Sequence, residues 1–273
     1  MDTEIDQKLI KLKNILHSLQ GVLVAYSGGV DSTFLLRYAL EALGTDKVLA
    51  VIAASETYPE HEKEEALKLA SELGAPYQII HTRELEDERF RSNPKERCYY
   101  CKLELFSQLN QIAKEKGLAF VVDGSNFNDR SDFRPGNQAK TELGIRSPLQ
   151  EAALTKKEIR EASKRLSLPT WDKPSYACLA SRIPYGTRIE PEILKKVEEA
   201  ENYLRSLSFK QLRVRHHGHL ARIELESQDI PKVLQDGLMD QINRRFEELG
   251  YFYVTIDLRG YRMGSLNEAL DHD

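Results

Sequence analysis

A short segment rich in glycine and hydroxyl groups, Ser27-Gly28-Gly29-Val30-Asp31-Ser32, has the residue types of a phosphate site. Two glycines let the backbone approach an anion without an intervening Cβ. The serine hydroxyls and the amides at the start of a following helix could donate hydrogen bonds to phosphate oxygens. The segment lacks the spacing and the lysine of a Walker loop, which argues against ordinary transfer of a terminal phosphoryl group. A glycine-rich turn without a ligand is the alternative.

Asp31 admits two interpretations. A carboxylate at a helix N-terminus is stabilised by the helix dipole and can cap amides. Beside a polyphosphate it could instead hold Mg²⁺, which prefers carboxylate and phosphate oxygens. We favour the magnesium role because phosphate is already implied by the neighbouring residues.

A second polar segment, Asp123–Gly136, combines carboxylates, amides and arginines. Gly124 would allow a nucleotide to pass close to the backbone, and Arg134 could neutralise charge on a phosphate. Three further side chains could orient ribose or a metal ion: Asn126, Asp129 and Asp132. A solvated acidic loop would have a similar composition.

The chain has three cysteines, Cys98, Cys101 and Cys178, and an odd number argues against a closed disulfide framework. Three thiolates could ligate three irons of a [4Fe-4S] cluster and leave the fourth iron open. The same residues could bind zinc together with a histidine such as His81, form a reversible Cys98–Cys101 disulfide, or be inert buried thiols.

Arginines alternate along a predicted strand near the C-terminus. Arg213 and Arg215 share one face by the period of two, and Glu224 lies on the matching face of the return strand. Neighbouring arginines suit a phosphate monoester, which they can bind in a bidentate fork. A solvent-exposed charged hairpin is the alternative. We expect His216–His219 to form an exposed turn rather than a metal site.

Strands and helices alternate through the first part of the chain, which predicts a parallel sheet with helices on both faces. Ligands bind such sheets at the carboxyl ends of the strands, so Ser55 joins the candidate nucleotide residues. The predicted strands are 22–26, 48–53, 77–81 and 119–122, and the predicted helices are 5–19, 31–43, 60–73, 101–116 and 155–167.

The pattern breaks at the proline-rich stretch 169–174, where we place a domain boundary. The prediction is a first domain over 1–176 and a smaller α+β domain over 177–273. In the second domain we expect a helix over 191–208, a hairpin over 211–225, a helix over 229–249 and a strand over 251–258.

Composition excludes several classes of protein. The chain has 273 residues, and 39 basic side chains nearly balance 43 acidic ones, so nucleic-acid binding through a general basic excess is not expected. No apolar run is long enough to span a bilayer. Residues 1–6 have neither the basic start nor the apolar core of a signal peptide, so we do not expect secretion. We expect a cytoplasmic protein with reduced thiols.

The glycine-rich segment resembles the PP-loop of ATP pyrophosphatases, in which S-G-G-x-D-S grips the pyrophosphate of ATP. This resemblance implies that ATP adenylates a substrate oxygen and that pyrophosphate leaves. The implied cofactors are ATP and Mg²⁺. The implied nucleotide-binding residues are Ser27, Gly28, Gly29, Val30, Asp31, Ser32, Ser55, Gly124, Asn126 and Asp129.

Two further stretches narrow the likeness to the LarE family of sulfur-inserting PP-loop enzymes. These are D-G-[ST]-N-x-x-D-x-x-D-x-R-P-G at Asp123–Gly136 and C-x-x-S-R-x-P-Y-G at Cys178–Gly186. The resemblance implies sulfur insertion into pyridinium-3,5-biscarboxylic acid mononucleotide for the nickel-pincer cofactor of lactate racemase. Arg213 and Arg215 would hold the substrate phosphate, and two carboxylates would form an acidic or metal-binding cluster: Glu201 and Glu224.

In that family the cysteine matching Cys178 resembles a sulfur donor consumed in the reaction. This chain departs from that pattern by the added Cys98 and Cys101, which favours a [4Fe-4S] cluster that carries transferable sulfide, as in related tRNA thiolases. Arg182 could stabilise the charge of the acyl-adenylate transition state. A cluster-dependent tRNA thiolase and a non-catalytic metal carrier are the alternatives. The second domain has little apolar mass of its own, so we expect it to pack on the first domain or on another subunit, and we expect a homo-oligomer.

Overall fold

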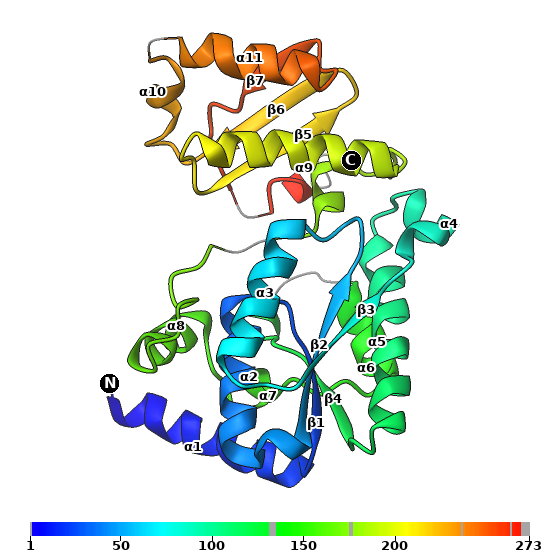
Figure 1. Ribbon diagram of the computed structural model, residues 1–273, viewed down its shortest axis with the longest axis vertical. Coiled ribbons are helices and arrows are strands. Elements are labelled where there is room, and N and C mark those ends of the chain that lie inside the picture. Colours follow the sequence, from blue (N-terminus) through cyan, green and yellow to red (C-terminus); the bar gives the residue numbers. More distant parts are fainter. Residues whose placement is uncertain (1, 131–134, 175–176, 236, 263, 269–273) are drawn as a thin grey trace. The chain divides into compact units, whose positions relative to one another are not determined.

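The computed structural model (Figure 1) describes residues 2–130, 135–174, 177–235, 237–262 and 264–268. The chain divides into two compact units. The first comprises Met1–Phe90 and Glu96–Tyr176, and the second comprises Arg91–Lys95 and Ala177–Asp273.

The first unit has a four-stranded parallel sheet in the order β3-β2-β1-β4. The strands are β1 (Val22–Ala25), β2 (Val48–Ala54), β3 (Tyr77–His81) and β4 (Phe120–Val122). The α-helices that begin in this part of the chain are α1 (Asp2–Leu19), α2 (Val30–Leu43), α3 (Glu60–Glu72), α4 (Glu88–Arg91), α5 (Arg97–Glu115), α6 (Gly136–Glu142), α7 (Pro148–Glu151) and α8 (Lys156–Arg165). Short 3₁₀ turns cover Thr45–Lys47, Glu84–Glu86 and Phe127–Arg130.

Helices cover both faces of this sheet (Figure 1), because successive residues of a buried parallel strand point to opposite sides. Val22 and Val24 pack with apolar residues of α1, α2 and α8, whereas Leu23 packs with Phe106 and Leu109 of α5. The predicted parallel α/β fold is therefore confirmed. None of the described helices is both long and apolar enough to cross a bilayer.

The second unit is a small mixed α+β structure, as the sequence predicted. Its elements are a 3₁₀ turn (Leu179–Arg182), α9 (Pro191–Ser206), β5 (Leu212–His217), β6 (Leu220–Leu225), α10 (Ile230–Val233), α11 (Leu238–Glu248) and β7 (Tyr253–Ile256). β5 pairs antiparallel with β6, which pairs parallel with β7. Residues from α9, α11 and one face of β5 and β6 form a separate hydrophobic core.

In the second unit, one predicted helix and one predicted turn differ from the structure. The helix expected over 229–249 is two helices, α10 and α11, and Gly237 before α11 has a left-handed backbone with φ 72°. Such a conformation cannot continue a right-handed helix. His216 is buried rather than part of an exposed turn, because strand β5 extends through His217 and directs His216 into the core.

Candidate functional site

The glycine-rich loop lies between the carboxyl end of β1 and the start of α2. Gly29 is the N-cap residue of α2 and provides no side-chain cap. The hydroxyls of Ser27 and Ser32 lie 3.2 Å apart, and the Ser32 hydroxyl also lies 3.3 Å from the Gly29 carbonyl oxygen. These contacts fold the loop over the first turn of a 14-residue helix, whose N-terminal amides suit an anion.

Glycine is required at two places around this loop. Gly28 has φ +61°, and a Cβ there would lie 2.7 Å from the Cβ of Ala66 in α3. A Cβ at Gly124, after β4, would lie 3.0 Å from the backbone nitrogen of Ser32. Both positions depend on close backbone packing, so the loops after β1 and β4 meet at the carboxyl edge of the sheet.

Asp31 in the first turn of α2 is paired with a lysine that the sequence analysis did not identify. Its Oδ2 lies 2.6 Å from Nζ of Lys156, the first residue of α8. The other oxygen, Oδ1, is buried and accepts no hydrogen bond of ordinary geometry in the described part of the chain. Burial raises the pKa of Asp31, and Lys156 opposes that rise. A buried carboxylate beside a phosphate site fits a magnesium ligand.

The polar loop after β4 uses several of its side chains to hold its own shape. Asp123 accepts hydrogen bonds from Ser147 at 2.6 Å and Ser125 at 2.7 Å, and it lies 3.0 Å from Nζ of Lys140. Asp129 accepts a hydrogen bond from the backbone nitrogen of Asn126 at 2.9 Å. Two predicted residues of this loop, Asp132 and Arg134, lie outside the described residues.

Ser55, after β2, is part of a buried hydrogen-bonding group at the same edge. Its hydroxyl donates to Oε1 of Glu84 at 2.7 Å, and the hydroxyl of Thr57 donates to the same atom at 2.6 Å. Oε2 of Glu84 is buried and has no hydrogen-bond partner among the described residues. Thr57 and Glu84 were missed from the sequence, although both follow predicted strands of the sheet.

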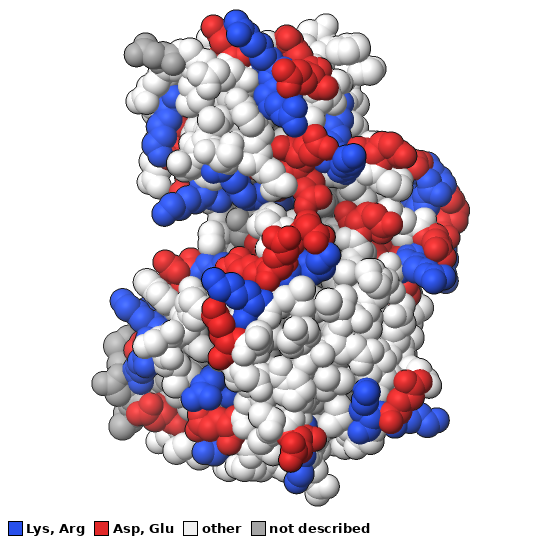
Figure 2. Space-filling view, viewed as in Figure 1, with Lys and Arg blue, Asp and Glu red and all other residues white. Residues whose placement is uncertain are grey.

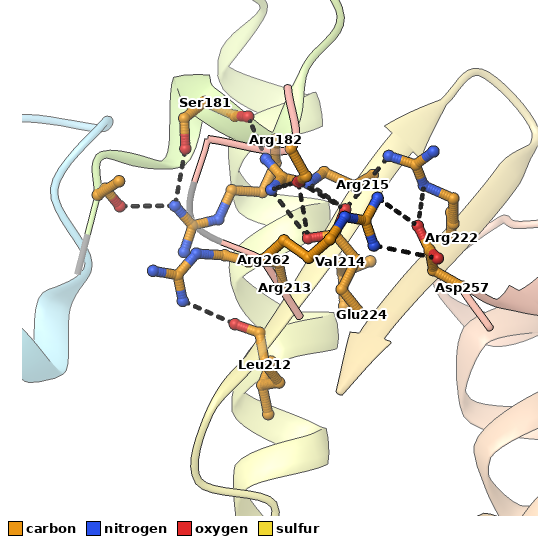
Figure 3. A network of polar contacts seen from close by, with 12 residues as sticks. Ser181, Arg182, Leu212, Arg213, Val214, Arg215, Arg222, Glu224, Asp257 and Arg262 are labelled. Atoms are coloured by element: carbon orange, nitrogen blue, oxygen red, sulfur yellow. Dashed lines mark hydrogen bonds and ion pairs between the residues drawn. The ribbon is translucent and has the colours of Figure 1, made fainter. Parts of the chain in front are cut away.

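The second unit contains a buried network of arginines and glutamates (Figure 3). Arg182 forms a bidentate pair with Glu201, with Nε to Oε1 at 2.8 Å and Nη2 to Oε2 at 2.9 Å. Both side chains are fully buried. Nη1 of Arg182 donates to the carbonyl oxygens of Ala177 at 2.6 Å and Cys178 at 3.0 Å. Arg182 therefore fixes the backbone that carries Cys178.

A second bidentate pair joins neighbouring strands of the hairpin. Nε and Nη2 of Arg215 donate to the carboxylate of Glu224 at 3.0 and 2.9 Å, and Arg222 adds a contact at 3.2 Å. The alternative of an exposed charged hairpin is wrong, because Arg213 and Arg215 are only 4% and 5% exposed. Covering segments, including Ser265 against Glu224, exclude solvent from this face.

The predicted acidic metal site does not fit these contacts. Glu201 accepts hydrogen bonds from Arg182, Arg205 and a backbone amide, and Glu224 is held by arginines and a serine. Burial, together with the positive charge of Arg182, lowers the pKa of Arg213 to about 10. Three buried guanidiniums, those of Arg182, Arg213 and Arg215, thus face two buried glutamates. Among the described residues, this group of buried guanidiniums suits an anion rather than a cation.

The three thiols are divided between the two units. Cys98 and Cys101 lie in the first two turns of α5, which begins at Arg97 and so earlier than the sequence predicted. Cys178 precedes the 3₁₀ turn of the second unit. None of them is in a disulfide. Among the described residues, no group of three or more His, Cys, Asp or Glu side chains is arranged to hold a metal ion.

The fold and the loop together define a PP-loop α/β protein. A family model described as NAD synthase matches residues 5–118. The chain is 44% identical to pyridinium-3,5-bisthiocarboxylic acid mononucleotide synthase of Lactiplantibacillus plantarum over 93% of this chain and 92% of that protein. The chain belongs to the LarE family of ATP-dependent sulfur transferases, which confirms the resemblance seen in its motifs.

Two other relatives extend the comparison. An uncharacterized protein of Synechocystis is 42% identical over 97% of this chain and 99% of its own length. A probable tRNA sulfurtransferase of Methanothermobacter thermautotrophicus is 28% identical over 67% of this chain, and the match covers 50% of that protein. Near full-length similarity is thus found with the synthase and not with this tRNA enzyme.

Proposed function

We propose that this chain inserts sulfur into pyridinium-3,5-biscarboxylic acid mononucleotide. A carboxylate oxygen of the substrate attacks the α-phosphorus of ATP, and pyrophosphate leaves. Sulfur then attacks the acyl-adenylate carbon, and AMP leaves. The carboxylate itself is a poor electrophile, and adenylation gives its carbon a good leaving group. Repetition at the second carboxylate gives the dithio product used for the nickel-pincer cofactor of lactate racemase.

The observation that carries the proposal is the N-terminus of α2 beside Asp31. Its glycine cap brings no side chain to the helix amides, and Oδ1 of Asp31 is buried with no hydrogen-bond partner among the residues that the structure describes. Asp31 would hold Mg²⁺, which neutralises phosphate charge when bound. Lys156 now pairs with Asp31. When nucleotide and metal bind, its ammonium group could leave that carboxylate and bind a phosphate oxygen instead.

In the second unit, Arg213 and Arg215 are proposed to bind the substrate phosphate. The burial of neighbouring guanidiniums supports this role, because arginines side by side can bind a phosphate through charge-assisted hydrogen bonds. Before substrate arrives, the guanidinium of Arg215 is held by Glu224, and that of Arg213 is held by the Leu212 carbonyl oxygen and the ring of Tyr261.

A [4Fe-4S] cluster held by Cys98, Cys101 and Cys178 is part of the proposal. Three soft thiolates suit iron, and such a cluster supplies an open iron that can carry sulfide. All three thiols are free of disulfides, which is the state that cluster ligands require. Consumption of Cys178 as the sulfur donor is the alternative.

The test uses anaerobically prepared protein incubated with Mg²⁺, the dicarboxylate nucleotide and ATP labelled at the α or γ phosphorus. Labelled AMP and pyrophosphate are expected, and release of ADP and orthophosphate alone would contradict adenylation. Mass spectrometry of the polypeptide separates the two sulfur sources. An intact Cys178 with about four irons per chain supports the cluster, whereas a polypeptide lighter by H₂S supports the alternative.

A tRNA thiolase is the second candidate for the activity. It would have the same loop and thiols, but it would be expected to carry a basic surface for RNA. The chain has a formal net charge of −4, and acidic and basic residues are interspersed on the face shown in Figure 2. A cytoplasmic homo-oligomer completes the proposal, and light scattering of the purified protein tests its oligomeric part.

A further inference from the structure

Lys173 is a buried lysine whose side chain contacts the backbone of the glycine-rich loop. It lies just before the end of the first unit, and its side chain is 8% exposed. Nζ lies 3.3 Å from the carbonyl oxygen of Gly28 and 2.9 Å from carboxylate oxygens of both Glu62 and Glu65 in α3. An ammonium group has three donors, and these contacts supply three acceptors.

The ammonium of Lys173 stays charged in this setting. Burial by itself lowers the pKa of Lys173, but hydrogen bonds and charge from Glu62 and Glu65 outweigh burial and raise it. The contact with Gly28 is therefore a charge-assisted hydrogen bond in a site shielded from water, where such bonds are stronger than neutral ones.

The Gly28 carbonyl belongs to a peptide that is unusually free to rotate. It joins two glycines, Gly28 with φ +61° and Gly29 with φ −80° and ψ 172°. Glycine adopts both signs of φ at little cost, so this peptide plane could flip unless one of its groups is held. Because a trans peptide is planar, its carbonyl and its N–H point in opposite directions. Holding the Gly28 carbonyl therefore sets the direction of the Gly29 amide.

The Gly29 amide is one of the donors at the start of α2. No hydrogen bond from it to another group is found in the described part of the chain. The amide thus faces away from Lys173 and is available to a ligand. Its direction decides whether it can donate to a phosphate oxygen bound at the helix N-terminus.

The backbone of Lys173 is itself fixed. Arg160 in α8 donates to the carbonyl oxygens of Trp171 and Lys173, both at 2.8 Å. The same helix begins with Lys156, which holds Asp31. Helix α8 thus anchors both cations that contact the loop, one at the Gly28 carbonyl and one at the Asp31 carboxylate.

We propose that Lys173 is a positioning residue of the nucleotide site, which orients the Gly28–Gly29 peptide so that the Gly29 amide donates to phosphate. This inference rests on the proposed use of ATP. It adds a role for a residue distant in sequence from the loop, and the role is exerted through the backbone rather than by contact with the nucleotide.

The test must separate positioning from simple neutralisation of two acids. Lys173→Met alone leaves Glu62 and Glu65 without their cation and could unfold the chain. The comparison is therefore made between Glu62→Gln/Glu65→Gln and Lys173→Met/Glu62→Gln/Glu65→Gln, which differ only in Lys173. Calorimetry measures the affinity of each for a non-hydrolysable ATP analogue with Mg²⁺, and thermal unfolding confirms that both fold. Lys68→Met, on the exposed side of α3, serves as the control for loss of a lysine.

We expect the triple variant to bind the analogue about tenfold more weakly than the double variant, and Lys173→Arg to retain most of the affinity. Equal affinities of the double and triple variants would overturn the proposal. A readout without nucleotide separates this result from failure of ATP binding itself. The amide resonance of Gly29 in ¹⁵N-labelled protein should shift between the two variants, and an unchanged resonance would also overturn the role of Lys173.

Discussion

Nζ of Lys156 lies 2.6 Å from Oδ2 of Asp31, although 125 positions separate the two residues in the sequence. Helix α8 begins at Lys156 with a capping box, in which Thr155 accepts from the amide of Glu158 and Glu158 binds back to Thr155. This cap fixes where the helix starts and therefore where Lys156 lies. The pair neutralises a buried carboxylate at the site where we expect Mg²⁺ and phosphate.

Replacing Lys156 by methionine should shift the pH dependence of pyrophosphate release. Burial raises the pKa of Asp31, and Lys156 lowers it, so loss of the lysine raises that pKa further. Asp31 must be ionised to hold Mg²⁺, and the acid limb of the rate profile should therefore move to higher pH. Lys157→Met, at an exposed position of the same helix, is the control. Superimposable profiles for Lys156→Met and the parent would contradict this role.

Alanine at Gly28 should lower the free energy of unfolding more than alanine at a left-handed glycine that has open space around it. Gly74 has φ +66° and open space around it, so Gly74→Ala should lower the free energy of unfolding by about 1 kcal/mol. Gly28→Ala adds a clash with Ala66 and should cost about 1–3 kcal/mol more. Urea unfolding of both variants measures the difference. Equal losses would show that the packing against α3 is not tight.

Much of the fold could be predicted from the sequence because it depends on local patterns. Apolar runs of strand length alternated with helical periodicity, and right-handed crossovers then require a parallel sheet. The break between α10 and α11 was missed because Gly237 lies within an otherwise helical pattern, where one glycine is often tolerated. The start of α5 was missed because nothing local marks Arg97 as a first helical residue.

The candidate site was only partly predictable. The glycine loop and the loop after β4 are contiguous motifs, so their residues could be named. Lys156 and Lys173 are contributed by distant segments, and only tertiary packing brings them to Asp31 and Gly28. The alternation along β5 correctly grouped Arg213 with Arg215, but it could not show that a covering segment buries them with Glu224. Strand periodicity indicates which face a residue occupies, not what packs against that face.

Protonation of His216 should destabilise the second unit in weak acid. Burial lowers the pKa of His216 to about 4, and its Nδ1 lies 3.3 Å from the hydroxyl of Tyr251. The unfolded chain takes up the proton near pH 6.5, before the folded chain does, so stability is present above pH 6.5 and falls as the pH drops through about 4. The loss attributable to His216 is about 3 kcal/mol.

His216→Gln checks this, because glutamine keeps a hydrogen-bonding group for Tyr251 and does not titrate. Denaturant titration between pH 7.5 and 4, in steps of about half a pH unit, measures the free energy of unfolding. As the pH falls, this free energy should decrease more steeply in the parent than in the variant. Parallel pH profiles would exclude His216 as the cause.

Loss of one member of the Arg182–Glu201 pair should destabilise the second unit strongly, whereas replacement of both members together should be tolerated. Arg182→Met leaves a buried carboxylate without its bidentate partner, so we expect the free energy of unfolding to fall by about 3–5 kcal/mol. Arg182→Met/Glu201→Met removes both charges and should recover much of that loss. Arg165 and Glu161 form a partly exposed pair at 2.6 Å, whose removal should cost less than about 1 kcal/mol.

We also expect the Arg182–Glu201 pair to affect stability in acid and the products of turnover. Burial alone raises the pKa of Glu201, but Arg182 outweighs burial and lowers it to about 2, so the stabilisation is present above pH 4.5 and is lost as the pH falls through about 2. The double variant should lack this acid dependence.

Because Arg182 also holds the carbonyl of Cys178, the folded double variant should still release pyrophosphate but form less thiocarboxylate product. Equal loss of both activities would instead assign Arg182 to the adenylation step.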